Sequence, residues 1–208
     1  MKRVIIGWVL LLSLTVFFSP SSVQAISLVF DPSAQNVTLG NTANVDVKIS
    51  GLGAPPFLGG FDLTVTFDPT ILGFSNAVFG SLLGNPALGE ATTVVSPSSG
   101  AVNLFEVSLL EGSLTGCILC VGPYLEDLQS SAFTLATLTF NTLAVGTSPL
   151  GLSHLILSDA DGNSLTADTV EGRVTVNPGA AVPEPSTLVL LGSGLAGLVA
   201  FRRRQQQM

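Results

Sequence analysis

Cysteine and histidine, the side chains that most often do chemistry, are rare in this 208-residue chain, with two cysteines and one histidine. Cys117 and Cys120 have a spacing that a tight turn brings within about 7 Å, close to the Cα range of a disulfide. We predict a structural disulfide, with free thiols or a metal-bound pair as alternatives. A redox C-x-x-C would have to open a helix in a thioredoxin-like setting, and the surrounding sequence has the pattern of strands.

Residues 159–163, Asp-Ala-Asp-Gly-Asn, resemble the start of a calcium-binding loop. An EF-hand loop has glycine at its sixth position and glutamate at its twelfth, where this chain has Ser164 and Val170. An Asp-Gly hairpin turn explains the same residues. The sequence therefore predicts no metal, with Asp159, Asp161 and Asn163 as an incomplete set of calcium ligands.

No arrangement of residues in this sequence has the spacing of a catalytic site. His154 alternates with the apolar residues Leu152 and Ile156, and neither a second histidine nor a serine in a nucleophile elbow accompanies it. A secreted hydrolase with two carboxylates beside a cleft is the least favoured alternative, since the sequence pairs no two of its acids. We predict no catalytic residue, no cofactor and no enzymatic activity.

Charge is distributed unevenly along the chain. Residues 26–182 contain two basic residues against thirteen acidic ones, a net charge of about −11, and the other five basic residues lie near the two ends. Nucleic-acid binding needs clustered Lys and Arg, so a nucleic-acid partner is excluded. The hydrophobic content of 47% argues against a disordered acidic segment and for one domain with a core.

The N-terminus has the three parts of a secretory signal. Lys2 and Arg3 precede an apolar run over residues 4–18, and small residues at 23 and 25 define a cleavage site after Ala25. We expect residues 1–25 to form a signal helix that directs export through the Sec route and is then removed.

The C-terminus combines three features in a fixed order. Pro183, Glu184 and Pro185 come first, an apolar run over residues 188–201 follows, and Arg202, Arg203 and Arg204 end it. The run is about 21 Å long as a helix, a marginal span of a bilayer core of about 30 Å, with the arginines on the cytoplasmic side.

This tail resembles the PEP-CTERM sorting signal of Gram-negative bacteria. The resemblance covers about residues 182–204, and it implies processing by an exosortase, a membrane protease-transferase. It also implies a transient inner-membrane anchor, followed by delivery to the cell surface or the extracellular matrix.

Between the two ends, apolar and polar residues alternate with the period of half-buried strands. Clusters of Gly, Pro, Asn and Ser separate these stretches, and no stretch outside the two ends has a helical pattern. We predict an all-β antiparallel sandwich of the jelly-roll type. Seven side chains should point into its core: Phe61, Leu63, Val65, Leu138, Phe140, Val174 and Val176.

The strand pattern resembles that of the cohesin-like β-sandwich. The resemblance is carried by residues 45–53, 58–72, 135–140, 157–163 and 172–176. It implies a non-catalytic surface domain related in shape to carbohydrate-binding modules.

We therefore expect residues 26–177 to be the sandwich, 178–187 a linker with the Pro-Glu-Pro motif, 188–204 a transmembrane segment with its arginines, and 205–208 a polar tail. The predicted function is that of a non-enzymatic exported surface or extracellular-matrix protein. The alternative is a displayed binding module for a glycan or a protein partner. Carbohydrate binding is the weaker of these, because Trp8 lies in the signal and Tyr124 is the only tyrosine.

Overall fold

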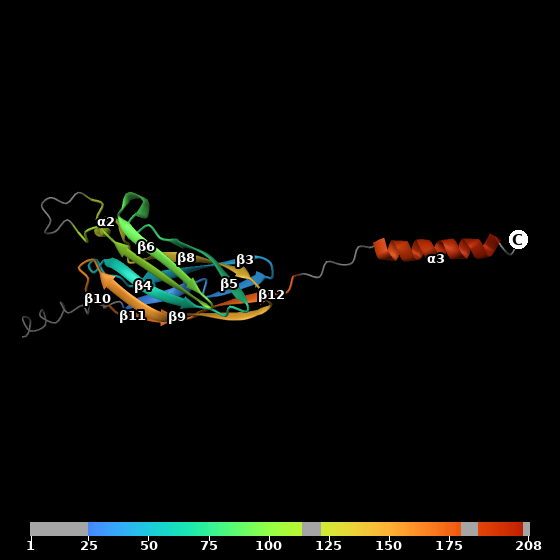
Figure 1. The fold of residues 1–208 in the computed structure, drawn as a ribbon, viewed down its shortest axis with the longest axis horizontal. Coiled ribbons are helices and arrows are strands. Elements are labelled where there is room, and N and C mark those ends of the chain that lie inside the picture. The colour runs from blue at the N-terminus through green and yellow to red at the C-terminus, as the bar shows by residue number, and fades with distance from the viewer. Residues whose placement is uncertain (1–24, 114–121, 180–186, 206–208) are drawn as a thin grey trace, which may run out of the picture.

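The computed structural model describes residues 25–113, 122–179 and 187–205, and most of these form a sandwich of two β-sheets (Figure 1). The first sheet has the order β11 (Ala167–Val170), β1 (Ile26–Asp31), β3 (Thr42–Ser50), β8 (Ala132–Thr142) and β5 (Leu72–Phe79). The second has the order β2 (Ala34–Thr38), β12 (Gly172–Asn177), β9 (Gly146–Asp159), β4 (Leu58–Thr66), β7 (Ala101–Ser108) and β6 (Ala91–Ser98), with β10 (Ser164–Leu165) beside β9.

Most neighbouring strands are antiparallel, as predicted, but β1 with β11 and β2 with β12 are parallel pairs. The chain passes from the first sheet to the second between β1 and β2, and again between β11 and β12. Pro32 lies between β1 and β2, where it has no N–H to donate to a neighbouring strand. At the second crossing a Cβ on Gly172 would lie 2.8 Å from the Cβ of Phe30, so the crossing requires glycine.

The core lies between the two sheets and is filled by the alternate side chains that each strand turns inward. All seven residues predicted to point inward are buried, none more than 3% exposed. Phe140 is at the centre, with the Phe67 ring 5.1 Å and the Phe74 ring 6.2 Å from its own, both edge-on. The predicted β-sandwich is therefore confirmed.

The two ends of the sandwich hold different connections (Figure 1). At the end where β12 finishes, here called the tail end, the Leu39 N–H donates to the Asn177 carbonyl oxygen and the Leu143 N–H donates to the Ile71 carbonyl oxygen. The opposite end, here called the far end, holds the start of β1, the β9–β10 turn and the short helix α2 (Leu125–Leu128). The chain therefore leaves the sandwich at the tail end.

Two short helices in the sandwich were not expected from the sequence, α2 and the 3₁₀ helix η2 (Pro86–Leu88). The longer helix α3 (Thr187–Gln205) includes the predicted C-terminal segment 188–204. A transmembrane helix was predicted there, but among the described residues no helix is both long and apolar enough to cross a membrane. The three arginines occupy the last turn of α3, which leaves a shorter apolar stretch. The predicted signal helix lies outside the described residues.

Candidate functional site

The strands β9, β4, β7 and β6 turn alternate side chains away from the core and form an exposed face of the second sheet. Cross-strand register aligns eight of these side chains in two adjacent rows. One row holds Ile156, Asp62, Phe105 and Val94, and the next holds His154, Thr64, Asn103 and Ser96. We call these eight residues the β4 face. Ile156 is 53% exposed and Val94 46% exposed, so the face presents apolar side chains beside polar ones.

A hydrogen-bond network holds the polar centre of the β4 face. The Asn103 side-chain amide donates to Asp62 Oδ1 at 2.6 Å and lies 3.2 Å from Thr64 Oγ1. The other carboxylate oxygen, Asp62 Oδ2, lies 3.9 Å from His154 Nε2. Asp62 is therefore a fixed, half-exposed carboxylate with apolar neighbours, an arrangement suited to orienting a partner. The alternating pattern of the sequence identified His154 as a polar residue between apolar ones. It did not show that His154 lies beside Asp62 and Asn103, because those two residues are themselves 41 positions apart in the chain.

Glu106 is the one buried carboxyl group among the described residues. It lies on β7 with Val102 and Leu104 on the core-facing side, and neither carboxylate oxygen has a hydrogen-bond partner in the described structure. Burial raises the pKa of Glu106 from 4.5 to about 8. A glycosidase needs two carboxyl groups facing one cleft, and Glu106 is a single group between the sheets, so it does not support the hydrolase alternative.

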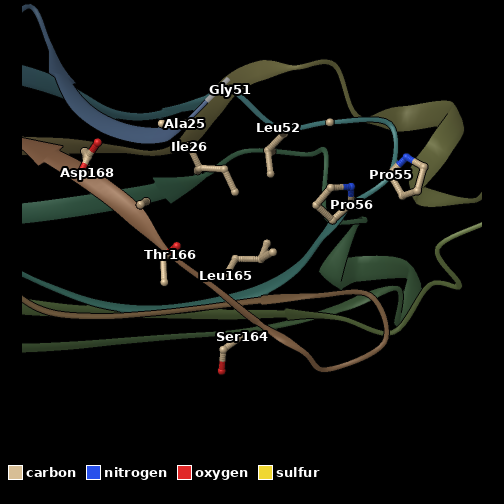
Figure 2. Close-up of a pocket in the computed structure, with 12 residues that line it drawn as sticks. Ala25, Ile26, Gly51, Leu52, Pro55, Pro56, Ser164, Leu165, Thr166 and Asp168 are labelled. Atoms are coloured by element: carbon tan, nitrogen blue, oxygen red, sulfur yellow. The ribbon is translucent and has the colours of Figure 1, made fainter. Parts of the chain in front are cut away.

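A hollow of about 800 Å³ opens at the far end of the sandwich (Figure 2). The side chains of Ile26, Leu52, Pro56 and Leu165 point into it, from β1, the β3–β4 loop and β10. Ala25, after which signal cleavage is predicted, lies on its rim, and its carbonyl oxygen would be 2.2 Å from a Cβ on Gly51. Its lining is part polar and part apolar, and Asp168 is the one charged side chain among the described residues that line it.

The loop over residues 159–163 folds around the Asp159 carboxylate. Asp159 Oδ1 accepts from the backbone N–H of Asp161 at 3.0 Å and of Asn163 at 2.7 Å, and Oδ2 accepts from the Asn163 side-chain amide at 2.9 Å. The hydrogen bonds from Asn163 hold the pKa of Asp159 below its usual value. In the described ranges no group of three or more His, Cys, Asp or Glu residues could hold a metal ion. That Asp159, Asp161 and Asn163 are an incomplete set of calcium ligands and bind no metal stays a prediction.

Several predicted residues lie elsewhere. Cys117 and Cys120 and the motif residues Pro183, Glu184 and Pro185 lie outside the described residues. Arg202, Arg203 and Arg204 are exposed in the last turn of α3. Basic side chains at this position stabilise a helix, because they interact with the negative end of its dipole.

Comparison with known proteins divides the chain in two. Residues 181–204 match the PEP-CTERM protein-sorting motif. No curated protein sequence is significantly similar to the chain.

The sandwich is similar to solved cohesin structures. The sixth cohesin of scaffoldin B from Acetivibrio cellulolyticus, solved in complex with a Cel5 dockerin mutant, is 21% identical with a TM-score of 0.57, over 74% of this chain and 99% of that one. The seventh ScaB type I cohesin from Pseudobacteroides cellulosolvens is 17% identical with a TM-score of 0.59, over 77% and 97%. A non-cellulosomal cohesin from Archaeoglobus fulgidus is 16% identical with a TM-score of 0.54, over 78% and 95%. At these identities the likeness concerns the fold, so this chain carries a PEP-CTERM sorting motif behind a domain with the cohesin fold.

Proposed function

We propose that this chain is a non-enzymatic, exported surface or extracellular-matrix protein, sorted and processed by an exosortase. The single observation that carries the proposal is the match of residues 181–204 to the sorting motif. In this proposal the short apolar segment and the arginines that follow it hold the chain at the inner membrane until it is processed. Pro183 and Pro185 disfavour helix and strand pairing, and we place the cleavage by a membrane protease at or near Glu184 for this reason. Processing there releases an acidic domain to the outside of the cell.

The test is fractionation of an exosortase-positive strain and its exosortase deletion, followed by immunoblotting. We expect a shortened protein in the surface or culture fraction of the first strain and a full-length tail in the membrane fraction of the second. Replacing Pro183 and Pro185 by alanine should leave the uncut membrane form in both strains. The matched control replaces Pro178, which lies before the motif, and should be processed normally. If both strains retain Arg204 in the mature protein at the inner membrane, the segment is a plain tail anchor.

We further propose that the sandwich binds a protein partner through the β4 face. The fold is that of cohesins, and one similar cohesin was solved in complex with a dockerin. The β4 face provides exposed aliphatic side chains around a carboxylate that Asn103 holds in place. No Lys or Arg is among its eight residues, so the complementary partner presents apolar and basic side chains.

This second proposal is tested by affinity capture from the exported proteins of the same organism. The variant Val94→Asp/Ile156→Asp should lose a protein that the unchanged domain captures, because two charges would be buried in the interface. Val78→Asp is the control, since Val78 is 58% exposed on β5 of the other sheet. Equal capture by all three proteins would place the partner elsewhere, and retention on a glycan array that survives the double substitution would favour the glycan alternative.

A further inference from the structure

The tail end of the sandwich combines exposed aliphatic side chains with few charges. Leu39 is 40%, Leu143 55% and Val145 52% exposed. Leu39 belongs to the β2–β3 turn, and the other two belong to the β8–β9 loop. The turns are joined by hydrogen bonds, because the Thr142 N–H donates to the Asn41 carbonyl oxygen and the Gly40 N–H donates to Thr142 Oγ1. We call Leu39, Leu143 and Val145 the apolar end.

The segments that form the tail end contain a single charged side chain. These segments are residues 39–41, 67–71, 98–100, 143–146 and 177–179, and the charged residue is Asp68. Its carboxylate is engaged locally, since Oδ1 accepts from the Thr70 N–H at 2.8 Å and from the Thr70 hydroxyl at 2.6 Å.

The far end of the sandwich has the opposite character. Its turns and short helices hold six of the thirteen carboxylates of the domain, which are Glu90, Glu111, Glu126, Asp127, Asp159 and Asp161. The far end of the domain therefore carries more negative charge than the tail end. An anionic lipid surface therefore repels the far end more strongly than the tail end.

The connection between β12 and α3 keeps the tail end of the sandwich close to the site at which α3 is anchored. Strand β12 finishes at Asn177, and the Leu39 N–H donates to the Asn177 carbonyl oxygen. From Gly179 to the first residue of α3, Thr187, the chain advances eight residues, which reach at most about 29 Å when fully extended. No other part of the sandwich is so restricted, because β1 begins at the far end.

From these three observations we infer that the apolar end is a membrane-contact surface, which rests on the lipid headgroup region while the chain is anchored and before the tail is cut. This inference rests on the proposed exosortase-dependent anchoring. Aliphatic side chains on turns enter the boundary between headgroups and acyl chains. The two turns that carry them, residues 39–41 and 143–146, contain no carboxylate, which limits repulsion from anionic lipids. The contact orients the domain with its acidic end outward, and it presents the linker at the membrane edge. Release of the tail would free the domain because three aliphatic side chains alone hold it weakly.

A single tryptophan reports this contact. Trp8 is the only tryptophan of the chain, so in a Trp8→Phe background an introduced indole is observed alone. The membrane form is purified from an exosortase-deletion strain and reconstituted into vesicles of phosphatidylethanolamine and phosphatidylglycerol. We expect the tryptophan emission of the Leu143→Trp protein to lie at shorter wavelength in vesicles than in the released domain, which is measured without detergent. The matched control Val94→Trp, at a similarly exposed site on the β4 face, should not shift.

A second variant separates contact from anchoring. Adding Leu39→Asp and Val145→Asp to the Leu143→Trp protein should abolish the shift while the protein still floats with the vesicles. A floating protein whose Leu143→Trp emission is unshifted, or shifted no more than that of Val94→Trp, overturns the inference and leaves the anchoring intact. A shift that appears only when exosortase is added assigns the surface to a protein and also overturns it. A protein that does not float overturns the anchoring and this inference together.

Discussion

At the scale of single residues, Glu106 makes the stability of the domain depend on pH. Its pKa is about 8 in the folded protein and is near 4.5 when the chain is unfolded and solvated. Below pH 4.5 the side chain is neutral in both states, so its burial costs least there. As the pH rises from 4.5 to 8 the unfolded chain releases a proton that the folded one retains, and each pH unit lowers the free energy of unfolding by about 1.4 kcal/mol.

The substitution Glu106→Gln tests this dependence because it keeps the shape and removes the charge. Urea unfolding should give similar free energies for both proteins below pH 4.5 and a more stable variant above pH 8. Glu171→Gln, at an exposed position, is the control and should follow the unchanged protein at every pH. Parallel curves for the unchanged protein and Glu106→Gln would mean that the Glu106 carboxylate is solvated.

At the scale of elements, β8 is the strand on which the packing of the first sheet depends. It lies between β3 and β5, and its residue Phe140 is fully buried against two other rings. The substitution Phe140→Ala removes those contacts and leaves a cavity, so we expect a loss of about 3–5 kcal/mol in the free energy of unfolding. Chemical denaturation at constant pH measures it.

The control for this element is the neighbouring strand β5. Val78→Thr retains a β-branched side chain at a position that is 58% exposed, and it should change stability by less than about 0.5 kcal/mol. Equal losses for Phe140→Ala and Val78→Thr would contradict the assignment of β8 to the centre of the core.

At the scale of the whole molecule, the two ends of the chain carry the positive charge and the sandwich between them carries the negative charge. In the proposed membrane-held form, the arginines at the end of α3 resist transfer across the membrane. Replacing all three by glutamate should therefore lower the amount of protein in the inner-membrane fraction of an exosortase-deletion strain, and fractionation with immunoblotting measures this.

Replacing Arg202, Arg203 and Arg204 by lysine is the matched control, because it keeps the charge and should keep the protein in the membrane fraction. Loss of both variants from the membrane would show that the arginine side chains act through specific contacts. Retention of both would show that charge at this end does not determine anchoring.

Local patterns made a large part of this molecule predictable. Alternation along single strands placed all seven predicted core side chains correctly, because a strand turns successive side chains to opposite faces whatever its partners are. The same rule could have found Glu106, which shares its parity with Val102 and Leu104 on β7. The sorting motif could be identified from the sequence for a related reason, since its features follow one another within one short segment.

The sequence did not predict which distant segments pair with one another. The two parallel pairs join β1 to β11 and β2 to β12, which are far apart in the chain. The β4 face likewise brings Asp62, Asn103 and His154 together from three strands. The contrast between the apolar and acidic ends also depends on which turns share an end. The sequence by itself therefore determined the sorting motif, the strand periodicity and the charge of this protein, because these are properties of neighbouring residues. Only the tertiary structure decided which side chains share a surface and which carboxyl group is buried, because strand register and sheet packing join residues that are far apart in the chain.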